Sequence, residues 1–309
     1  MSGRIDAARE PMRDRSSVTQ EPSSELLRTA REPISGQSGA AEESMIALIT
    51  GASGGIGRAT VCWFLNQGID VIGLDLVPAP DETAGAGDAD GAEKTGAGDI
   101  AGAEKTCAAD AADSEKAGAA DADGPARGRY THCIADVRDP ETYPALAPES
   151  MPHILVNCAG VQSSSDDIDV NLKGTIRITE AFAIGNDRIR AVVNVGSASA
   201  HTGSEFPEYA ASKGGLLSYT KNVALRLAPK ATCNSIDPGG VLTDLNQCVI
   251  DDETLWQQIM ELTPLKRWAA PEEIAEWIYF VAVRNRFMTG QNLLIDGGEA
   301  GNAKFIWPE

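Results

Sequence analysis

Short apolar runs alternate along most of the chain with stretches in which apolar residues recur at helical spacing. The short runs predict strands over residues 45–50, 69–75, 130–135, 153–157, 190–196, 231–236 and 291–295. The stretches between them predict helices over about 55–67, 168–184, 208–228, 251–261 and 271–284. Alternating strands and helices form parallel sheets that are covered on both faces. The pattern therefore predicts an α/β fold of one domain, a Rossmann-type doubly wound parallel sheet of about seven strands flanked by helices.

Residues 1–44 lack this pattern. They are polar and rich in Arg, Ser, Glu and Pro, which predicts a disordered N-terminal tail. The mixture of acids with arginine argues against a transit peptide. Because Met45 opens directly into the first predicted strand, our hypothesis is that Met45 is the natural start. Residues 1–44 would then be a gene-start artefact or a dispensable tail.

Residues 79–127 interrupt the predicted domain of residues 45–309. They contain three similar 11-residue units, GAGDADGAEKT, GAGDIAGAEKT and CAADAADSEKA, with twelve acidic and four basic residues across the segment. An 11-residue period can mark a helical supercoil, but these units offer almost no apolar residues for a seam. We therefore expect a disordered acidic insertion rich in Gly, Ala and Asp rather than a helical arm. A docking site for a cationic partner is the functional alternative.

Composition and charge narrow the classes of function. The net charge of −19 repels phosphates, which argues against nucleic acid and anionic membranes as partners. No apolar run approaches the ~20 residues of a membrane span, and the N-terminus has no secretory apolar region. Six cysteines without a Cys-x-x-Cys pair suit a reducing, cytoplasmic setting. Three histidines without ligand spacing predict that no metal is bound.

The first strand runs into a glycine-rich turn, Thr-Gly-Ala-Ser-Gly-Gly-Ile-Gly over residues 50–57, and then into a helix. Glycines allow a sharp turn and a close approach to a pyrophosphate, whose charge is met by the helix N-terminus. A glycine cluster is weak evidence alone, but its place between a buried strand and a helix predicts dinucleotide binding. The candidate cofactor residues in this turn are Gly51, Ser53, Gly55, Ile56 and Gly57.

Asp75 ends the second predicted strand, about twenty residues beyond the glycine turn. A carboxylate at this place can accept hydrogen bonds from both ribose hydroxyls and repels a 2′-phosphate. Residues 51–57 and 76–78 contain no Lys or Arg that would neutralise such a phosphate. The sequence therefore predicts NAD(H) rather than NADP(H) as the cofactor.

Tyr209 and Lys213 are spaced i and i+4 on one predicted helix, so their side chains share a face. A phenol normally titrates near pH 10, and a neighbouring ammonium together with an oxidised nicotinamide would lower its pKa. Ser197 follows an apolar strand, at the sheet edge where such folds bind ligands. Its hydroxyl is placed to bind a substrate oxygen while Tyr209 exchanges the proton. Taken alone, the Tyr–Lys spacing is more typical of an exposed helix pair than of a catalytic one.

With these motifs the chain resembles the short-chain dehydrogenase/reductase family, over nearly all of residues 45–78 and 128–300. The resemblance implies the catalytic residues Asn171, Ser197, Tyr209 and Lys213. It implies further cofactor contacts at Asp136, Val137, Asn157, Ala159, Gly160, Tyr209, Lys213, Pro238, Gly239, Val241 and Thr243. It also implies a homo-oligomer, a tetramer or a dimer, that pairs the helices at about 168–184 and 208–228.

Some positions depart from the family pattern. Cys158 replaces the second Asn of the Asn-Asn-Ala-Gly motif, and Ser197 and Tyr209 lie one residue closer than is commonest. The connection from Gly160 to Asn171 has about half its usual length, which should open or reshape the substrate wall. Asp237 adds a carboxylate near the cofactor, and we expect it simply to bind water.

Residues 239–262 are expected to form a substrate lid that mixes apolar and acidic residues. In overall pattern the chain looks like 3-oxoacyl-(acyl carrier protein) reductase members of the family, a label that dehydrogenases of sugars, polyols or steroids often inherit. The sequence thus predicts an enzyme that interconverts a secondary alcohol and a ketone with NAD(H). The alternatives are a catalytically weak NAD-binding sensor or scaffold, and an interaction protein that works through residues 79–127.

Overall fold

The computed structural model describes residues 44–78, 127–162, 165–204 and 206–302. The predicted N-terminal tail and the predicted acidic insertion therefore lie outside the described residues, apart from Ser44 and Arg127 at their ends.

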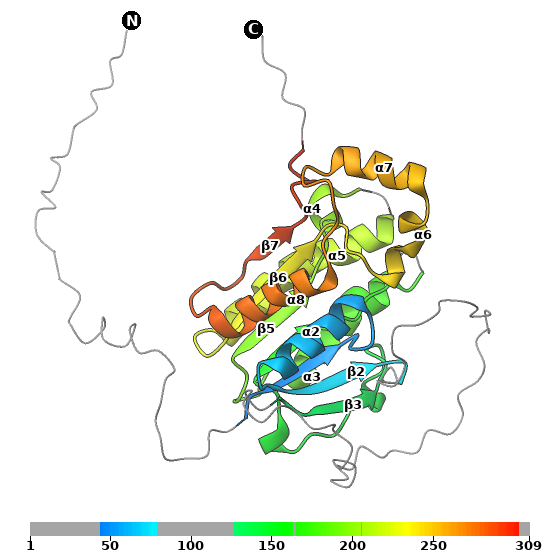
Figure 1. Ribbon diagram of the computed structural model, residues 1–309. Coiled ribbons are helices and arrows are strands. Elements are labelled where there is room, and N and C mark those ends of the chain that lie inside the picture. The colour runs from blue at the N-terminus through cyan, green and yellow to red at the C-terminus, as the bar shows by residue number, and fades with distance from the viewer. Residues whose placement is uncertain (1–43, 79–126, 163–164, 205, 303–309) are drawn as a thin grey trace, which may run out of the picture. The chain divides into compact units, whose positions relative to one another are not determined.

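A single sheet of seven parallel strands forms the centre of the domain (Figure 1). The strands are β1 (Ile46–Thr50), β2 (Asp70–Asp75), β3 (Tyr130–Ile134), β4 (Ile154–Asn157), β5 (Ala191–Val195), β6 (Thr232–Pro238) and β7 (Asn292–Ile295). Their order is β3-β2-β1-β4-β5-β6-β7, so the connections run in opposite directions from the neighbours β1 and β4. This topology confirms the predicted Rossmann-type doubly wound fold. Ligands in such sheets bind beyond the carboxyl ends of the strands, at the point where the order reverses.

Helices cover both faces of the sheet (Figure 1). They are α2 (Gly55–Asn66), α3 (Thr175–Phe182), α4 (Ser199–Thr202), α5 (Pro207–Leu227), α6 (Gln247–Ile250), α7 (Glu253–Leu262) and α8 (Pro271–Tyr279). Short 3-10 turns lie at Pro140–Thr142, Pro148–Ser150 and Asp244–Asn246. The helix predicted over 251–261 is α7, which begins later because the Asp252 side chain accepts a hydrogen bond from Leu255 N at 2.9 Å.

Two predicted helices differ from expectation. The stretch 168–184 begins as a π-helix over Ile168–Gly174 before α3, and the stretch 271–284 ends as a π-helix over Phe280–Arg284 after α8. A π-turn adds a residue to the turn while the apolar face persists, so the apolar pattern alone reads it as ordinary helix.

Each face of the sheet buries its own apolar layer. Along β1, Ala47 and Ile49 point to the layer that contains Phe64 of α2 and Ile274 of α8. Leu48 points to the opposite layer, which α3 and α5 complete. Side chains alternate across a strand, so a strand that is covered on both sides is apolar throughout. Each fully buried Leu, Ile or Phe side chain contributes about 1.5–3 kcal/mol to the stability of the fold. This packing fixes the strand ends relative to one another.

Candidate functional site

The glycine turn after β1 packs directly against the segment that follows β4. Gly51 has a φ of 67°, and a Cβ at this residue would lie 2.8 Å from the backbone of Ala159. Thr50 Oγ1 accepts hydrogen bonds from the backbone N–H groups of Cys158 and Ala159, both at 3.0 Å. Glycine is needed at residue 51 because both the conformation and the close approach exclude a side chain.

The N-terminus of α2 has the features of an anion site. Its N-cap, Gly54, provides no side-chain cap, and the first turn contains no acidic residue. Ser53 Oγ is buried and has no hydrogen-bond partner among the described residues. Unpaired N–H groups at a helix start bind phosphate readily, so this turn fits the pyrophosphate of a dinucleotide. Thr243 reaches the same turn, because a Cβ at Gly55 would lie 2.4 Å from its Cγ2.

Asp75 lies beside the glycine turn at the end of β2. Its Oδ2 accepts a hydrogen bond from Ser53 N at 2.9 Å, and its Oδ1 accepts one from Val77 N at 3.3 Å. The carboxylate is half-buried and joins the turn to the strand end. A ribose bound next to the pyrophosphate would meet this carboxylate, as expected from the sequence.

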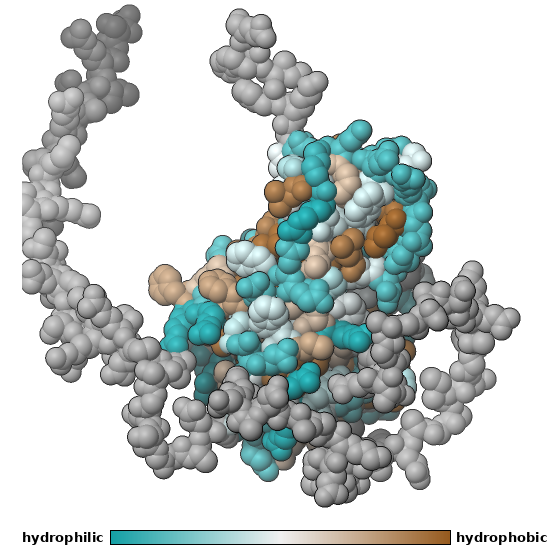
Figure 2. All heavy atoms as spheres, viewed as in Figure 1, coloured by the Kyte–Doolittle hydropathy of each residue, from teal (hydrophilic) through white to brown (hydrophobic). Residues whose placement is uncertain are grey.

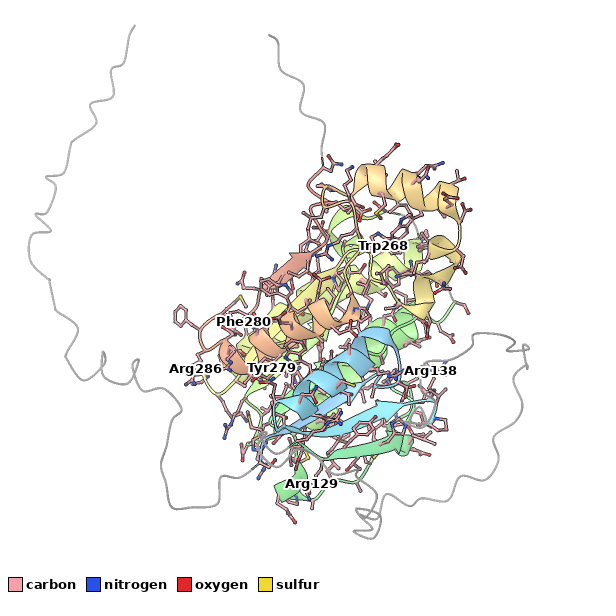
Figure 3. The ribbon with its side chains drawn as sticks, viewed as in Figure 1. Arg129, Arg138, Trp268, Tyr279, Phe280 and Arg286 are labelled. Atoms are coloured by element: carbon pink, nitrogen blue, oxygen red, sulfur yellow. The ribbon has the colours of Figure 1, made fainter. Side chains whose placement is uncertain are left out.

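Asp136 follows β3 and is bound by a neighbouring cation. Arg138 donates to both of its carboxylate oxygens, at 2.7 and 3.0 Å, and also to Asp166 at 2.9 Å (Figure 3). The guanidinium holds the pKa of Asp136 below its ordinary value. Any adenine contact by this carboxylate would be shared with Arg138. The adjacent Val137 is held through its carbonyl, which accepts a hydrogen bond from Tyr143 at 2.7 Å.

The structure turns the Asn157 side chain away from the glycine turn. Its Nδ2 donates to Thr179 Oγ1 at 3.0 Å and to Asn194 Oδ1 at 2.9 Å, and the residue is buried. Asn194 in turn donates to Thr220 Oγ1 at 2.9 Å. This polar network joins β4 and β5 to the layer of α3 and α5. A contact between the cofactor and residue 157 would therefore have to use its backbone.

Lys213 and its neighbours converge beneath the carboxyl ends of β4 and β5. Its Nζ donates to the Val195 carbonyl at 2.8 Å and lies 5.7 Å from the centre of the Tyr209 ring. A Cβ at Gly160 would lie 3.5 Å from this Nζ and 3.2 Å from Asn171 Oδ1. The structure thus brings the predicted Tyr–Lys pair, Asn171 and the segment after β4 into one neighbourhood.

Asn171 joins this segment to α5. Its Oδ1 accepts from Val161 N at 2.8 Å, while its Nδ2 donates to the Val161 carbonyl at 2.9 Å and to Ser212 Oγ at 3.1 Å. Ser212 Oγ donates in turn to the Tyr209 carbonyl at 2.7 Å. The fully buried amide therefore sets the position of the shortened connection relative to the start of α5.

A short connection separates Ser197 from Tyr209. Ser197 is 8% exposed, and its Oγ accepts a hydrogen bond from Ser199 N at 3.1 Å. Tyr209 is half-buried in the first turn of α5. Phe206 precedes this helix with a φ of 40°, a strained conformation for a bulky residue that leads the chain into α5.

Asp237 corrects one expectation from the sequence. Its Oδ2 lies 2.6 Å from His201 Nε2, so this oxygen binds a side chain where we expected water. Burial raises the pKa of Asp237, and the hydrogen bond from His201 opposes that rise. The two residues are far apart in sequence, and no periodic pattern or motif joins them, so sequence reasoning missed the pair.

The predicted lid after β6 is amphipathic. Trp256 of α7 packs edge-on against Trp268, with ring centres 5.1 Å apart. Figure 2 shows apolar side chains among the hydrophilic ones over α6 and α7. The exposed leucines of this region are Leu242, Leu245, Leu255, Leu262 and Leu265.

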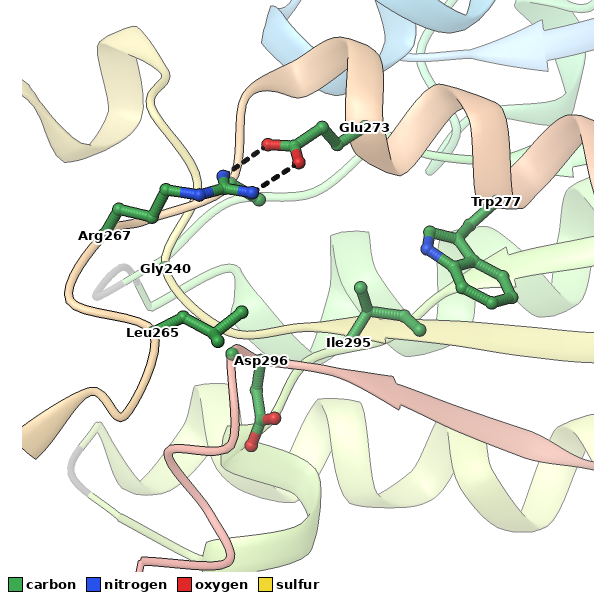
Figure 4. A pocket seen from close by; sticks show the side chains of 9 residues that line it. Gly240, Leu265, Arg267, Glu273, Trp277, Ile295 and Asp296 are labelled. Atoms are coloured by element: carbon green, nitrogen blue, oxygen red, sulfur yellow. Dashed lines mark hydrogen bonds and ion pairs between the residues drawn. The ribbon is translucent and has the colours of Figure 1, made fainter.

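A surface pocket of about 190 Å³ is lined by the segment after β6, by α8 and by the end of β7 (Figure 4). Its rim includes Arg267 and Glu273, which form a bidentate ion pair at 2.6 and 2.7 Å. None of the predicted site residues lines this pocket. Within the described ranges no cluster of side chains is suited to a metal ion, and no helix there is long and apolar enough to cross a membrane.

The comparisons identify similar proteins. A family model described as enoyl-(acyl carrier protein) reductase matches residues 51–299. The chain is 28% identical to human (3R)-3-hydroxyacyl-CoA dehydrogenase over 278 residues, which cover 82% of this chain and 95% of that protein. It is 31% identical to the 3-oxoacyl-[acyl-carrier-protein] reductase of Staphylococcus epidermidis over 161 residues, which cover 47% of this chain and 65% of that protein.

Among solved structures, 4-hydroxyisoleucine dehydrogenase complexed with NADH superposes with a TM-score of 0.64 at 26% identity. The match covers 84% of this chain and 100% of that one. The names of these proteins describe oxidoreductases that act on hydroxyl or keto groups or on acyl thioesters, and this solved structure contains a nicotinamide dinucleotide.

Proposed function

The chain belongs to the short-chain dehydrogenase/reductase family, and we propose that it interconverts a secondary alcohol and a ketone with NAD(H). The observation that carries this proposal is the convergence of Tyr209, Lys213 and Asn171 beside the segment after β4, next to the glycine turn. A sensor or scaffold would need the glycine turn alone and has no use for this second cluster.

The glycine turn and Asp75 fit a dinucleotide. The uncapped start of α2 and the unpartnered Ser53 Oγ would hold the pyrophosphate, and Asp75 would accept hydrogen bonds from the ribose. The segment from Pro238 to Thr243 would lie against the nicotinamide, since Thr243 already reaches the turn. When bound, the nicotinamide supplies or accepts the hydride.

Tyr209 is the proposed acid and base. Lys213 Nζ lies 5.7 Å from the centre of the Tyr209 ring, and the Tyr209 hydroxyl would exchange a proton with the substrate oxygen. Ser197 would hold that oxygen by a hydrogen bond. Asn171 would act through structure, because its amide fixes the segment after β4 against α5.

The preference for NAD(H) over NADP(H) rests on Asp75. The carboxylate is held by two backbone N–H groups, and a 2′-phosphate would bring negative charge against it. The exposed leucines of the amphipathic lid favour a small or medium secondary alcohol that carries an apolar part. A dehydrogenase of this cofactor preference suits catabolism or redox balance. We further propose a cytoplasmic homo-oligomer, a dimer or a tetramer, which sedimentation would measure.

The proposal is tested by NADH oxidation and NAD⁺ reduction across ketones, 3-oxoacyl thioesters, sugars and steroids. Tyr209→Phe should reduce turnover by about 10²-fold or more while NADH binding is retained. Tyr219→Phe is the matched control, because it removes a phenol from the same helix away from Lys213, and it should keep turnover. Tight NADH binding with no turnover of any substrate would favour the sensor instead.

A further inference from the structure

His201 and Asp237 form a pair that the proposed reaction leaves unused. The Asp237 carboxylate has no exposed surface, and His201 Nε2 lies 2.6 Å from its Oδ2. Its Oδ1 is also buried and finds no hydrogen-bond partner within the described ranges. Taking a carboxylate out of water costs several kcal/mol, a cost that a neutral side chain would avoid. An acid kept here against that cost points to a use beyond packing.

The space for this carboxylate comes from Gly196, the residue before Ser197. A Cβ at Gly196 would lie 2.0 Å from Asp237 Oδ1, so any larger residue would displace the carboxylate. Strands β5 and β6 are paired directly below this point, with Val195 opposite Ile236. Gly196 and the buried acid therefore belong to one local arrangement at the end of the two strands.

The pair connects α4 to the C-terminal end of β6, and proposed site residues adjoin both places. His201 belongs to α4, the short helix directly after Ser197, and Asp237 directly precedes the Pro238–Gly239 segment. The start of α4 and the end of β6 also share a backbone hydrogen bond, from Ala198 N to the Pro238 carbonyl at 2.7 Å. One backbone hydrogen bond and one side-chain hydrogen bond thus connect α4 to the end of β6.

We propose that His201 and Asp237 are positioning residues, which hold Ser197 and the Pro238–Gly239 segment at a fixed separation. The inference rests on the proposed function, in which Ser197 binds the substrate oxygen and Pro238–Gly239 lies against the nicotinamide. A hydrogen bond to a carboxylate is shorter and stronger than one between neutral groups, which suits a rigid tie. Neither residue takes part in the transfer of the proton or the hydride.

Kinetics of single and double variants test the pair. His201→Ala should lower kcat by about tenfold or more, with the Kd for NADH changed by less than about threefold. His201→Gln should recover most of the loss, because its amide nitrogen can replace Nε2 as the donor. The double variant His201→Ala/Asp237→Leu should be no slower than the slower single variant, since each change removes the same hydrogen bond. Losses that multiply, or full turnover in His201→Ala, would overturn the proposal.

Hydrogen exchange tests the same tie without any substrate. The Ala198 amide should exchange about tenfold faster in His201→Ala and in Asp237→Leu, because the start of α4 opens more often. Asp70→Asn is the control, since it removes a carboxylate that pairs with Arg129 at 2.8 Å at the start of β2. An unchanged exchange rate of the Ala198 amide in both test variants would contradict the inference. A wild type that turns over no substrate would defeat the proposed function, and the exchange result would still decide the pair.

Discussion

Strands β2 and β6 each carry an aspartate at their carboxyl ends, yet Asp75 and Asp237 have opposite surroundings. Asp75 is half-buried, and its two oxygens accept hydrogen bonds from the backbone of Ser53 and Val77. Asp237 is fully buried and binds a side chain, His201, that belongs to another loop. The first carboxylate borders the proposed ribose site, whereas the second lies behind the proposed catalytic loop.

The comparison shows when the hydrogen-bond partners of a residue at a strand end can be predicted from the local sequence. The hydrogen-bond donors to Asp75 come from Val77, just after the strand, and from Ser53 of the glycine turn, so its surroundings follow from two neighbouring segments. The ligand of Asp237 is set by the packing of β5 against β6 and by the missing side chain at Gly196. A carboxylate next to a motif can thus serve that motif or support a loop behind it.

The largest effect is expected in the glycine turn beside Asp75. In Gly57→Ala the new Cβ would fall 2.0 Å from the Gly51 carbonyl oxygen, so the turn cannot keep its conformation. NADH affinity should fall by about 10²-fold or more, as measured by fluorescence titration. Gly214→Ala is the matched control, because a Cβ there meets no atom of the described residues within 4 Å. Equal NADH affinities in the two variants would show that this turn does not hold the cofactor.

A smaller effect is expected from the charge of Asp75. Asp75→Asn keeps an oxygen that can accept from Ser53 N but removes the repulsion of a 2′-phosphate. The ratio of kcat/KM for NAD(H) over that for NADP(H) should fall by about tenfold or more. The measurement is initial rates with both cofactors, and an unchanged ratio would mean that Asp75 does not select the cofactor.

The buried carboxylate should make stability depend on pH in the opposite sense to a paired surface acid. Burial raises the pKa of Asp237 above its unfolded value near 3.8, although His201 and Lys213 oppose this rise. The folded protein then holds the proton more tightly than the unfolded chain, so stability falls as pH rises. From about pH 4 upward the wild type should lose free energy of unfolding relative to Asp237→Asn. Denaturant unfolding at several pH values measures this, and the opposite trend would contradict a raised pKa.

The smallest effect is expected at the exposed end of β2. Arg129 binds Asp70 at 2.8 Å and holds the pKa of Asp70 below its ordinary value. Because the arginine is exposed, Asp70→Asn should cost at most about 1 kcal/mol of stability. Turnover should not change, and a larger cost on thermal unfolding would show that this pair supports the sheet more than exposure suggests.

The glycine turn and the strands around it could be predicted from the sequence because their signals are local. The glycines, the strand before them and Asp75 lie within a short stretch, and each has a steric or electrostatic reason. The arrangement of the strands could also be predicted, because alternating strands and helices allow few topologies. The π-helical turns could not be predicted, because an added residue in a turn leaves the apolar face nearly unchanged.

The catalytic half could be predicted in its residue types but not in its supports. Tyr209 and Lys213 follow from helical spacing, yet the orientation of Asn157 into the α3–α5 layer depends on contacts with Thr179 and Asn194. The bond between His201 and Asp237 likewise joins residues that only the fold brings together. Such side-chain partners are set by tertiary packing, which leaves no periodic signal in the chain.

Hydride transfer from NADH to the substrate is tested most directly by isotope labelling. The protein is incubated with NADH that carries two deuterium atoms at C4 and with each ketone of the substrate panel, and the products are analysed by mass spectrometry. We expect an alcohol with one deuterium bound to the carbinol carbon, formed by the wild type and lost in Tyr209→Phe. An alcohol without carbon-bound deuterium, or labelled product at an equal rate in Tyr209→Phe, would contradict hydride transfer with Tyr209 as the acid and base.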